Sequence, residues 1–459
     1  MASHIFSRAP QPVQPIETKH RSIKTSIPCP GTADILTRLD ATESRSMHGQ
    51  LPLVWDRANN YNVYDAAGNK WIDFTSCIFV ANVGHSNPHL SSSIAATLDR
   101  PLYSCYAYGN EIRATYLEKL LEFAGKPFEK AFLLSAGTEA TEAALKLIRM
   151  HGQKVGKRRG GIVTIQNNWH GRTMGAQMLS SNEGQKSWIG NLDSDIHHIP
   201  FPYPWDTNDK TGLDVLDKGL TQLKENGVDL SQDIAGFMLE TFQGWGAVFY
   251  PKEYVQAIKD ICDKYDILLA FDEMQAGFAR CGKAFGYEHY EVEPDLICVG
   301  KGMGGGVPIS GVLGRKHIMD LPDIGNMSST HSANPMCCAA GLAVLEEIQS
   351  KDLVEESRRK GDLLFAELKK LEARFPHRMG PSLGRGLLAA IFLYKPNTRE
   401  ADGPFGSRVC ELAMQKGLLM VHTGRESIKL GPPLTIPDDA IIEAMEILGD
   451  CIAEVDAMP

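Results

Sequence analysis

Short apolar runs separated by longer amphipathic stretches dominate the middle of the chain. The runs are continuous rather than alternating, which is typical of strands that are covered on both faces in a parallel sheet. A helix with proline at its start is predicted at Pro251–Tyr265. The alternation of strand and helix indicates an α/β layered domain. We expect five central strands, at Phe132–Leu134, Ile162–Ile165, Phe237–Leu239, Ile267–Phe271 and Leu296–Val299.

The pattern changes towards both ends of the chain. Alternating residues at Val54–Trp55 and Tyr61–Tyr64, followed by a glycine turn and Trp71–Asp73, predict a small antiparallel unit. Beyond residue 337, apolar residues recur at helical spacing over 353–371 and again over 441–452. The two ends of the chain are therefore expected to form a smaller α+β domain beside the central one.

These changes of residue pattern divide the chain into four predicted segments. Residues 1–45 are rich in proline and basic residues and are expected to form an N-terminal arm. Residues 46–84 would be the first part of the small domain, and residues 85–330 the large α/β domain. Residues 331–459 would complete the small domain.

Composition excludes several functional classes. Hydrophobic residues make up 43% and charged residues 22% of the 459 positions, which is ordinary for a globular protein. A net charge of −9 gives no electrostatic case for a nucleic acid or an anionic membrane as partner. No apolar run is long enough for a membrane span, and no signal peptide is visible. The ten cysteines lack zinc or redox spacing, which predicts a cytoplasmic protein with reduced thiols and no metal site.

The first candidate for chemistry is the segment Ser135-Ala136-Gly137-Thr138-Glu139-Ala140. A predicted strand runs into Gly137-Thr138, and good helix formers follow. Glycine permits close backbone approach, so the helix N-terminus and the threonine hydroxyl suit a phosphate group. Taken alone, these residues favour an ordinary helix start with a capping carboxylate over a phosphate site.

Two further candidates stand at the ends of neighbouring predicted strands. Asp272 follows one strand, where open α/β sheets bind ligands, although capping of the next segment would also explain it. Lys301 follows the next strand, and glycines surround it; a lysine is rarely buried without a partner or a task. The glycines do not fit a dinucleotide fingerprint because Val307 takes the third position. A lysine, an acid and a phosphate cup together suit pyridoxal phosphate.

With these motifs the chain resembles the class III aminotransferases, the family of the ornithine, acetylornithine and 4-aminobutyrate enzymes. The resemblance spans roughly residues 50–455 and rests on several long motifs in the right order. They are Ser-Ala-Gly-Thr-Glu-Ala from Ser135, Trp-His-Gly-Arg-Thr from Trp169, Phe-Asp-Glu-Met-Gln from Phe271, Asp-Leu-Ile-Cys-Val-Gly-Lys from Asp295, Thr-His-Ser-Ala-Asn-Pro from Thr330 and Pro-Pro-Leu-Thr-Ile from Pro432.

The resemblance implies a fold and a set of catalytic roles. The fold would be that of the fold type I, aspartate-aminotransferase-like enzymes, with a mostly parallel central sheet and a smaller α+β domain. Lys301 would form the Schiff base with pyridoxal 5'-phosphate and shuttle the proton. Asp272 would pair with the ring nitrogen of the cofactor, and Gln275 would bind its phenolic oxygen.

The remaining cofactor contacts are also implied by the family. Gly137 and Thr138 would donate to the phosphate, and Trp169 would stack on the ring in the place where relatives usually carry phenylalanine. Thr330 would reach the phosphate of a neighbouring subunit. The resemblance therefore implies a homodimer with shared active sites.

The substrate side departs from the family pattern. Arg172 stands where the 4-aminobutyrate enzymes hold a substrate carboxylate, but a structural ion pair is an equal alternative. Ile78 lies on a segment that would wall the pocket. Trp245 replaces a glutamate that in many relatives masks an arginine, and Lys429 replaces that arginine, with Arg425 nearby. Both members of this pair differ, as expected of a pocket rebuilt for another substrate.

The expected reaction moves an amino group from an amine or ω-amino acid donor to a 2-oxo acid or aldehyde. An aminomutase, racemase, phospholyase or decarboxylase on the same scaffold is the alternative, because cofactor motifs do not separate these outcomes. A non-catalytic relative is disfavoured by the presence of both Lys301 and Asp272. A nucleotide-binding protein is disfavoured by Val307 and by the lack of a Walker motif.

Overall fold

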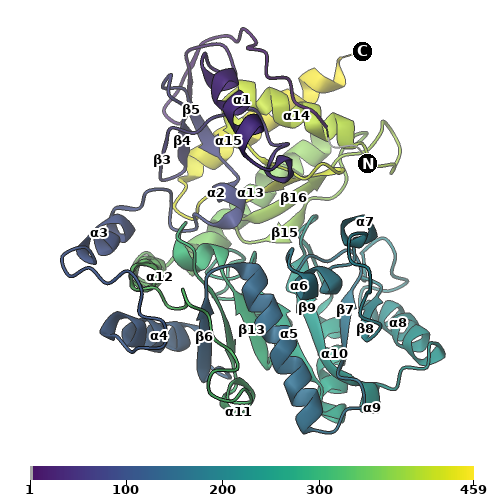
Figure 1. The fold of residues 1–459 in the computed structure, drawn as a ribbon. Coiled ribbons are helices and arrows are strands. Elements are labelled where there is room, and N and C mark those ends of the chain that lie inside the picture. Colours follow the sequence, from purple (N-terminus) through teal and green to yellow (C-terminus); the bar gives the residue numbers. More distant parts are fainter. Residues whose placement is uncertain (1–3, 459) are drawn as a thin grey trace. The chain divides into compact units, whose positions relative to one another are not determined.

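The computed structural model describes residues 4–458, which divide into two compact units (Figure 1). The large unit consists of Pro88–Gly244 and Val248–Val354. The small unit takes the chain up to Asn87, the three residues Trp245–Ala247 and the chain from Glu355 onward. The two units therefore differ in extent from the predicted segments.

Two of the predicted boundaries need correction. Helix α12 (Pro335–Ser350) packs against α3 (Pro88–Ala96) and α4 (Glu111–Ala124), so the large unit extends to Val354 rather than to residue 330. The first 45 residues are not a separate arm. Their strand β2 (Ser22–Ile23) pairs with β5 (Lys70–Asp73) and so belongs to a sheet of the small unit.

A seven-stranded sheet forms the centre of the large unit. All its strands run parallel except β14, which lies antiparallel between β6 and β13. This confirms the predicted fold class. In spatial order the strands are β6 (Lys130–Leu134), β14 (Ser310–Gly314), β13 (Leu296–Val299), β12 (Leu268–Asp272), β9 (Ile234–Glu240), β7 (Gly161–Ile165) and β8 (Ile196–Ile199).

Helices cover both faces of this sheet. Helix α5 (Gly137–Lys154) packs across β14, β13, β12 and β9, and α10 (Lys252–Tyr265) packs on β12 and β9 from the other side (Figure 1). Strands covered in this way read as continuous apolar runs, which is why the sequence revealed them. The other helices are α6 (Met174–Leu179), α7 (Glu183–Lys186), α8 (Leu213–Glu225), α9 (Leu230–Asp233) and α11 (Lys316–Met319), with a short hairpin of β10 (Phe242–Gln243) and β11 (Val248–Phe249).

The small unit contains two sheets and four longer helices. Strands β1 (Ile16–Glu17), β2, β5, β4 (Asn62–Tyr64) and β3 (Arg57–Asn59) form one sheet, which β17 (Leu418–Leu419) joins. The second sheet has the order β15 (Leu383–Arg385), β16 (Leu388–Phe392), β19 (Ser427–Leu430) and β18 (Val421–His422). The longer helices are α1 (Thr32–Thr42), α13 (Leu353–Arg374, from Glu355 in this unit), α14 (Gly403–Gln415) and α15 (Asp438–Asp456).

One predicted strand is wrong. Val54–Trp55 lies outside the ladder, which begins with the pair Arg57 and Tyr64. The left-handed turn residue Asn60, at φ 53°, closes a tight hairpin between β3 and β4 and sets this register.

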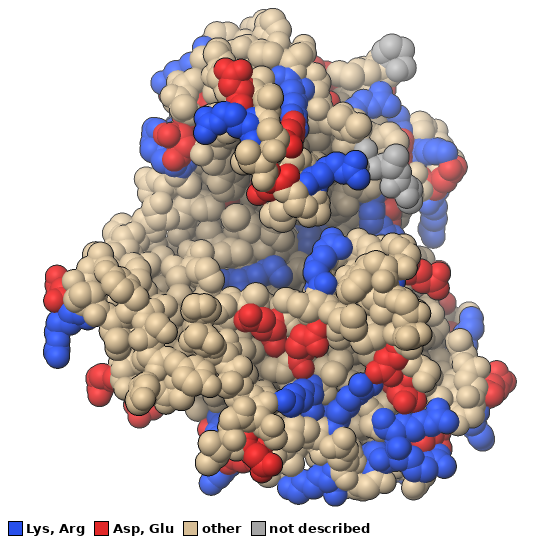
Figure 2. Space-filling view, viewed as in Figure 1, with Lys and Arg blue, Asp and Glu red and all other residues tan. Residues whose placement is uncertain are grey.

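The surface of the large unit is unevenly charged. The loop between α3 and α4 exposes five large apolar or aromatic side chains, and Figure 2 shows few charged residues over this part of the surface. The five residues are Leu98, Leu102, Tyr103, Tyr106 and Tyr108. In the described chain, no helix is long and apolar enough to cross a membrane.

A buried carboxyl group holds together the chain that follows β12. Glu273 accepts hydrogen bonds from the Thr241 hydroxyl at 2.6 Å and from the backbone N–H groups of Gly286 and Tyr287 at 2.8 and 2.7 Å. The side chain has no exposed surface. Burial raises the pKa of Glu273 to about 7, against the lowering effect of these hydrogen bonds.

This shift predicts a pH-dependent stability. A carboxyl group whose pKa is higher in the folded state favours folding while it is protonated, so its contribution falls as the pH rises from about 4.5 to about 7. Replacing it by Glu273→Gln removes this titration. In denaturant unfolding of the cofactor-free protein, the parent should lose about 2–3 kcal/mol relative to the variant between pH 5 and pH 8.

The exposed Glu446 provides a matched control, because Glu446→Gln changes the same functional group at the surface. Its unfolding curve should follow that of the parent at every pH. Parallel stability profiles for the parent and Glu273→Gln would contradict the prediction.

Candidate active site

Neighbouring strands of the large unit bring acidic side chains together at one edge of the sheet. Asp272 is the last residue of β12, and the register aligns it with Glu240, the last residue of β9. On its other side, Asp272 is aligned with Cys298 of β13, and Lys301 follows three residues later. Asp272, Glu240 and Lys301 line a common cavity of about 410 Å³, part of which is open to solvent. This is the edge at which α/β sheets bind ligands.

The cavity brings together most of the cofactor residues that were predicted from the sequence. Its lining includes six of these seven residues, namely Gly137, Thr138, Trp169, Asp272, Gln275 and Lys301. Thr330 does not belong to the lining and is exposed.

Lys301 begins a short 3-10 helix, η3 (Lys301–Gly304), with its backbone in the left-handed region at φ 47°. A non-glycine residue adopts this conformation at an energetic cost, which is common at functional sites. Burial lowers the pKa of the Lys301 amine, while the carboxylates of Asp272 and Glu240 oppose this shift. The site therefore favours an amine that exchanges its proton more readily than a surface lysine does.

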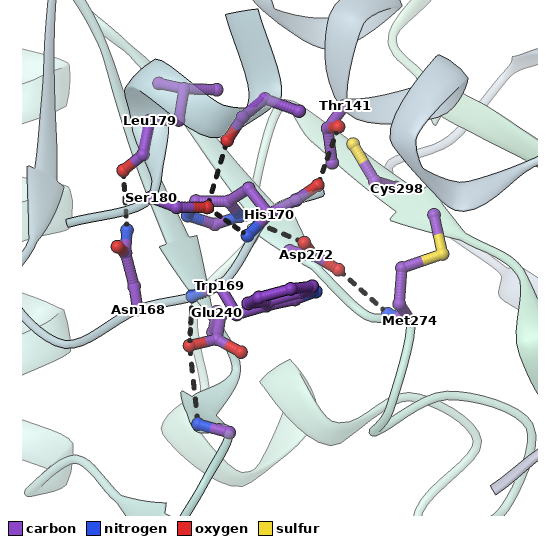
Figure 3. Close-up of polar contacts among 12 residues, drawn as sticks. Thr141, Asn168, Trp169, His170, Leu179, Ser180, Glu240, Asp272, Met274 and Cys298 are labelled. Carbon is purple, nitrogen blue, oxygen red and sulfur yellow. Dashed lines mark hydrogen bonds and ion pairs between the residues drawn. The ribbon is translucent and has the colours of Figure 1, made fainter. Parts of the chain in front are cut away.

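Asp272 is held firmly on two sides. One carboxylate oxygen, Oδ1, accepts a hydrogen bond from the backbone N–H of Met274 at 3.0 Å. The other, Oδ2, lies 2.9 Å from Nδ1 of His170, whose side chain is fully buried (Figure 3). Asp272 therefore both caps the segment that follows β12 and lines the cavity.

Two titratable residues that line the cavity, His170 and Glu240, were not singled out by the sequence analysis. His170 was visible only as part of the Trp-His-Gly motif, and its contact with Asp272 joins residues 102 positions apart. Glu240, like Asp272, is the last residue of its strand, so its position in the sequence could have identified it as a site residue. Its Oε2 accepts hydrogen bonds from the backbone N–H groups of Trp169 at 3.0 Å and Gly244 at 3.3 Å (Figure 3).

Two glycines lie close to the Met274 side chain where the strands meet α5. A Cβ atom on Gly137 would lie 2.9 Å from the Met274 sulfur, and one on Gly300 would lie 2.7 Å from the same atom. Side chains at either position would displace Met274 from the wall of the cavity. The first turn of α5 therefore approaches the end of β12 closely. The backbone N–H groups of Glu139 and Ala140 donate to the Ala136 carbonyl at 3.0 and 3.3 Å, whereas those of Gly137 and Thr138 have no acceptor within the helix.

Thr138 anchors the loop that carries Arg172. Its hydroxyl oxygen accepts hydrogen bonds from the backbone N–H groups of Arg172 at 3.3 Å and Thr173 at 3.2 Å. It also lies 2.7 Å from the Thr173 hydroxyl, which donates to Glu142 at 2.5 Å. The hydroxyl that was expected to bind a phosphate therefore also shapes the neighbouring loop.

Arg172 contacts an aromatic ring rather than an acidic partner. Its guanidinium carbon lies 4.4 Å from the centroid of the Trp169 ring, whose residue is 36% exposed. This is a cation–π arrangement. The alternative of a structural ion pair for Arg172 is not supported by any ion pair among the described residues.

The other predicted substrate residues lie in the small unit. Ile78 is 42% exposed and belongs to α2 (Ser76–Phe79), a left-handed turn with φ between 46° and 66°. Such a run of non-glycine residues is strained. It is held in place by a hydrogen bond from the Ser76 hydroxyl to the Gly431 carbonyl at 2.6 Å, and by the Thr75 hydroxyl, which accepts from Cys77 N at 3.1 Å.

Trp245 and Lys429 each contact neighbours within the same unit. The Trp245 ring packs edge-on against Phe392 at 5.5 Å, and the Arg425 guanidinium lies 3.9 Å from the ring centroid. Lys429 is buried on β19, with its ammonium 4.7 Å from the centroid of the Phe79 ring. The tryptophan at the glutamate position and the lysine at the arginine position thus each take part in a cation–π contact, Trp245 with Arg425 and Lys429 with Phe79.

Comparisons with known proteins identify the family of the chain. Residues 44–452 match the family model described as Aminotransferase class-III. The ornithine aminotransferase of Emericella nidulans is 31% identical over 414 residues, which cover 88% of this chain and 87% of the relative. The leucine/methionine racemase of Thermococcus litoralis is 32% identical over 416 residues, covering 88% and 91%.

A solved structure shows the same fold. An amine transaminase from an uncultivated Pseudomonas species, in its PLP-bound internal aldimine form, superimposes with a TM-score of 0.81 at 28% identity, covering 90% of this chain and 97% of that chain. The resemblance inferred from the motifs is therefore confirmed. The chain belongs to the class III aminotransferases, enzymes that transfer amino groups with the help of pyridoxal phosphate.

Proposed function

We propose that the chain transfers an amino group from an amine or ω-amino acid donor to a 2-oxo acid or aldehyde. The observation that carries this proposal is a single cavity lined by the Lys301 amine, the Asp272 carboxylate and the first turn of α5. Bound pyridoxal phosphate supplies an aldehyde that condenses with amines and a ring that accepts electrons from the substrate carbon.

The residues around the cavity fit this cofactor. The N–H groups at the start of α5 suit its phosphate, and Gly137 has no side chain to stand between these groups and the phosphate. Asp272 can accept a hydrogen bond from the protonated ring nitrogen, and Gln275 can bind the phenolic oxygen. The flat face of Trp169 suits stacking, which requires Arg172 to move from the ring face or to cover the opposite side.

In this proposal, Lys301 holds the cofactor through its amine and then moves the proton at the substrate carbon. Its lowered pKa supports the role of a base, because a larger fraction of the amine is unprotonated near neutral pH. Asp272 stabilises the positive charge on the ring nitrogen. Met274 N–H and His170 keep the carboxylate in place during the reaction.

The relative named as a racemase supports a second candidate, in which Lys301 returns the proton to the opposite face of an α-amino acid. The two reactions differ in their products. Transamination leaves the amino group on the cofactor and releases a carbonyl product, whereas racemisation changes only the configuration of the amino acid.

A single-turnover experiment separates these candidates. The loaded protein is mixed with a panel of amines, ω-amino acids, diamines and α-amino acids without an acceptor, and the cofactor absorbance is followed. We expect conversion to the aminated cofactor with at least one donor. In Lys301→Ala the rate should fall by roughly 10²–10⁴-fold or more, because the proton-transfer group is lost.

The outcome that favours the racemase is equally clear. If no donor aminates the cofactor while an α-amino acid loses its optical purity, the chain is not an aminotransferase in function. Normal turnover in Lys301→Ala would contradict both candidates.

We further propose that Lys429 binds the carboxylate of one substrate. Supporting this role, it is a buried cation on the second sheet of the small unit, at the position where the family resemblance implies a carboxylate-binding arginine. The ring of Phe79 fixes the ammonium from one side. As a point charge, lysine makes fewer directed hydrogen bonds than arginine, which suits a substrate other than that of the relatives.

Two substitutions test this role. Lys429→Met keeps the length of the side chain but removes its charge, so KM for carboxylate-bearing substrates should rise roughly 10- to 100-fold. Lys429→Arg keeps the charge and should retain KM within a few-fold. Steady-state kinetics with an uncharged amine serve as the control and should be similar in all three proteins. An unchanged KM for carboxylates in Lys429→Met would exclude the role.

We also propose that the protein is a cytoplasmic homodimer with shared sites. The five exposed apolar side chains of the α3–α4 loop support a second copy as their partner, because such a surface is rare on a monomer. Thr330 is exposed in its own chain, as a residue serving the partner's phosphate would be. The ten cysteines, all without disulfides, support a reducing compartment.

Light scattering should give about twice the 50.4 kDa of one chain, and a monomer mass would contradict the dimer.

A further inference from the structure

Behind Asp272, a chain of buried polar side chains leads away from the cavity. His170 contacts Asp272 through Nδ1, and its other ring nitrogen, Nε2, lies 3.4 Å from the Thr164 hydroxyl on β7. The Thr164 hydroxyl in turn accepts a hydrogen bond from the Asn168 amide at 2.5 Å. All four residues are at most 7% exposed. The proton positions along this chain therefore depend on the protein and not on solvent.

The orientation of the Asn168 amide is fixed by a backbone carbonyl. Its nitrogen, Nδ2, donates to the Leu179 carbonyl oxygen at 3.1 Å (Figure 3). A carbonyl oxygen only accepts hydrogen bonds, so the NH₂ group and not the oxygen of Asn168 faces Leu179. The same NH₂ group therefore donates to the Thr164 oxygen.

This orientation determines the direction of the next hydrogen bond. Because Thr164 Oγ1 accepts from Asn168, its own proton is available for His170 Nε2. A ring nitrogen that accepts a hydrogen bond carries no proton. In a neutral imidazole the proton is then on Nδ1, which donates it to Asp272 Oδ2 at 2.9 Å.

A neutral His170 avoids placing two positive charges on one carboxylate. With the cofactor bound, the protonated ring nitrogen would lie next to Asp272, and a charged His170 ring would face it across the same carboxylate. Like charges at short range repel each other.

The backbone of His170 is held independently of this chain. Its N–H donates to the Ser180 hydroxyl at 2.9 Å, and its carbonyl accepts from the Thr141 hydroxyl at 2.9 Å (Figure 3). The ring is therefore positioned by one set of contacts, and its proton by another. The two effects can be separated by mutation.

We propose that Thr164 and Asn168 are positioning residues that hold His170 as the neutral Nδ1–H tautomer, so that Asp272 keeps its charge and orientation for the cofactor. The part that concerns the cofactor rests on the proposed role of Asp272. The part that concerns the tautomer rests only on the contacts of the described residues. At 3.4 Å the Thr164 contact is at the weak end of hydrogen bonding, so its loss should have a moderate effect.

The first readout is the protonation of His170 in the cofactor-free protein. Histidine labelled with ¹⁵N gives separate signals for protonated and unprotonated ring nitrogens, and His170→Gln identifies those of His170. We expect a protonated Nδ1 and an unprotonated Nε2 in the parent. In Thr164→Val, which keeps the shape of the side chain but removes the hydroxyl, the two tautomers should become mixed.

A second substitution should raise the population of protonated Nε2. In Asn168→Asp the carboxylate only accepts hydrogen bonds, so it draws the Thr164 proton away from His170. Nε2 then faces an oxygen that can accept, so its protonated form becomes more populated than in the parent, while Asp272 Oδ2 at 2.9 Å continues to favour a proton on Nδ1. If Thr164→Val does not fold, Asn168→Asp alone tests whether these residues set the tautomer of His170.

Two controls separate the tautomer from general damage. Thr164→Ser restores the hydroxyl and should restore the parent signals. Thr141→Val removes an equally buried hydroxyl that contacts the His170 backbone, so it should leave the ring signals unchanged. Unchanged ring signals in both Thr164→Val and Asn168→Asp, or a His170 that is protonated on Nε2 in the parent, would overturn the proposal.

The second readout is the dissociation constant of pyridoxal phosphate, measured by titration of the cofactor-free protein. It should rise about 5- to 10-fold in Thr164→Val and in Asn168→Asp but not in Thr164→Ser, as expected for the loss of a weak supporting hydrogen bond. If the tautomer changes while cofactor affinity and absorbance stay constant, the tautomer assignment stands and the proposed role of Asp272 fails.

Discussion

The site depends on two carboxylates that stand side by side at the end of a buried sheet, with a lysine amine in the same cavity. The parallel pairing of β9 and β12 places Glu240 directly beside Asp272, and like charges so placed would repel each other. Each carboxylate has its own donors, His170 and the Met274 N–H for one and two backbone N–H groups for the other. The sheet thus places the two carboxylates together, and hydrogen-bond donors from the surrounding loops stabilise their charges.

Much of the fold could be predicted because buried parallel strands are continuous apolar runs. All five predicted central strands are present, as is the helix that follows Pro251. Strand β8 was missed because its sequence, Ile-His-His-Ile, carries two polar residues, and β14 because glycines stand at two of its five positions. The end of the large unit was placed too early because the packing of α12 on α3 and α4 leaves no local signal.

The site was predictable where its residues stand at the ends of strands or in family motifs, as Asp272 and Lys301 do. Contacts between distant segments were not predictable. His170 meets Asp272 only because β7 and the loop after it lie two strands away in the same sheet. Likewise, the aromatic partners of Lys429 and Arg425 come from other segments of the small unit, so neither stacking contact is visible in the sequence.

The central claim is that the cofactor is attached to Lys301. Reduction of the loaded protein with borohydride makes such a linkage permanent, and mass spectrometry of its peptides then locates the added mass. The account predicts that the added mass is found on the peptide containing Lys301, with the near-visible absorbance lost at the same time. Label on another lysine, or complete release of the cofactor after reduction, would contradict it.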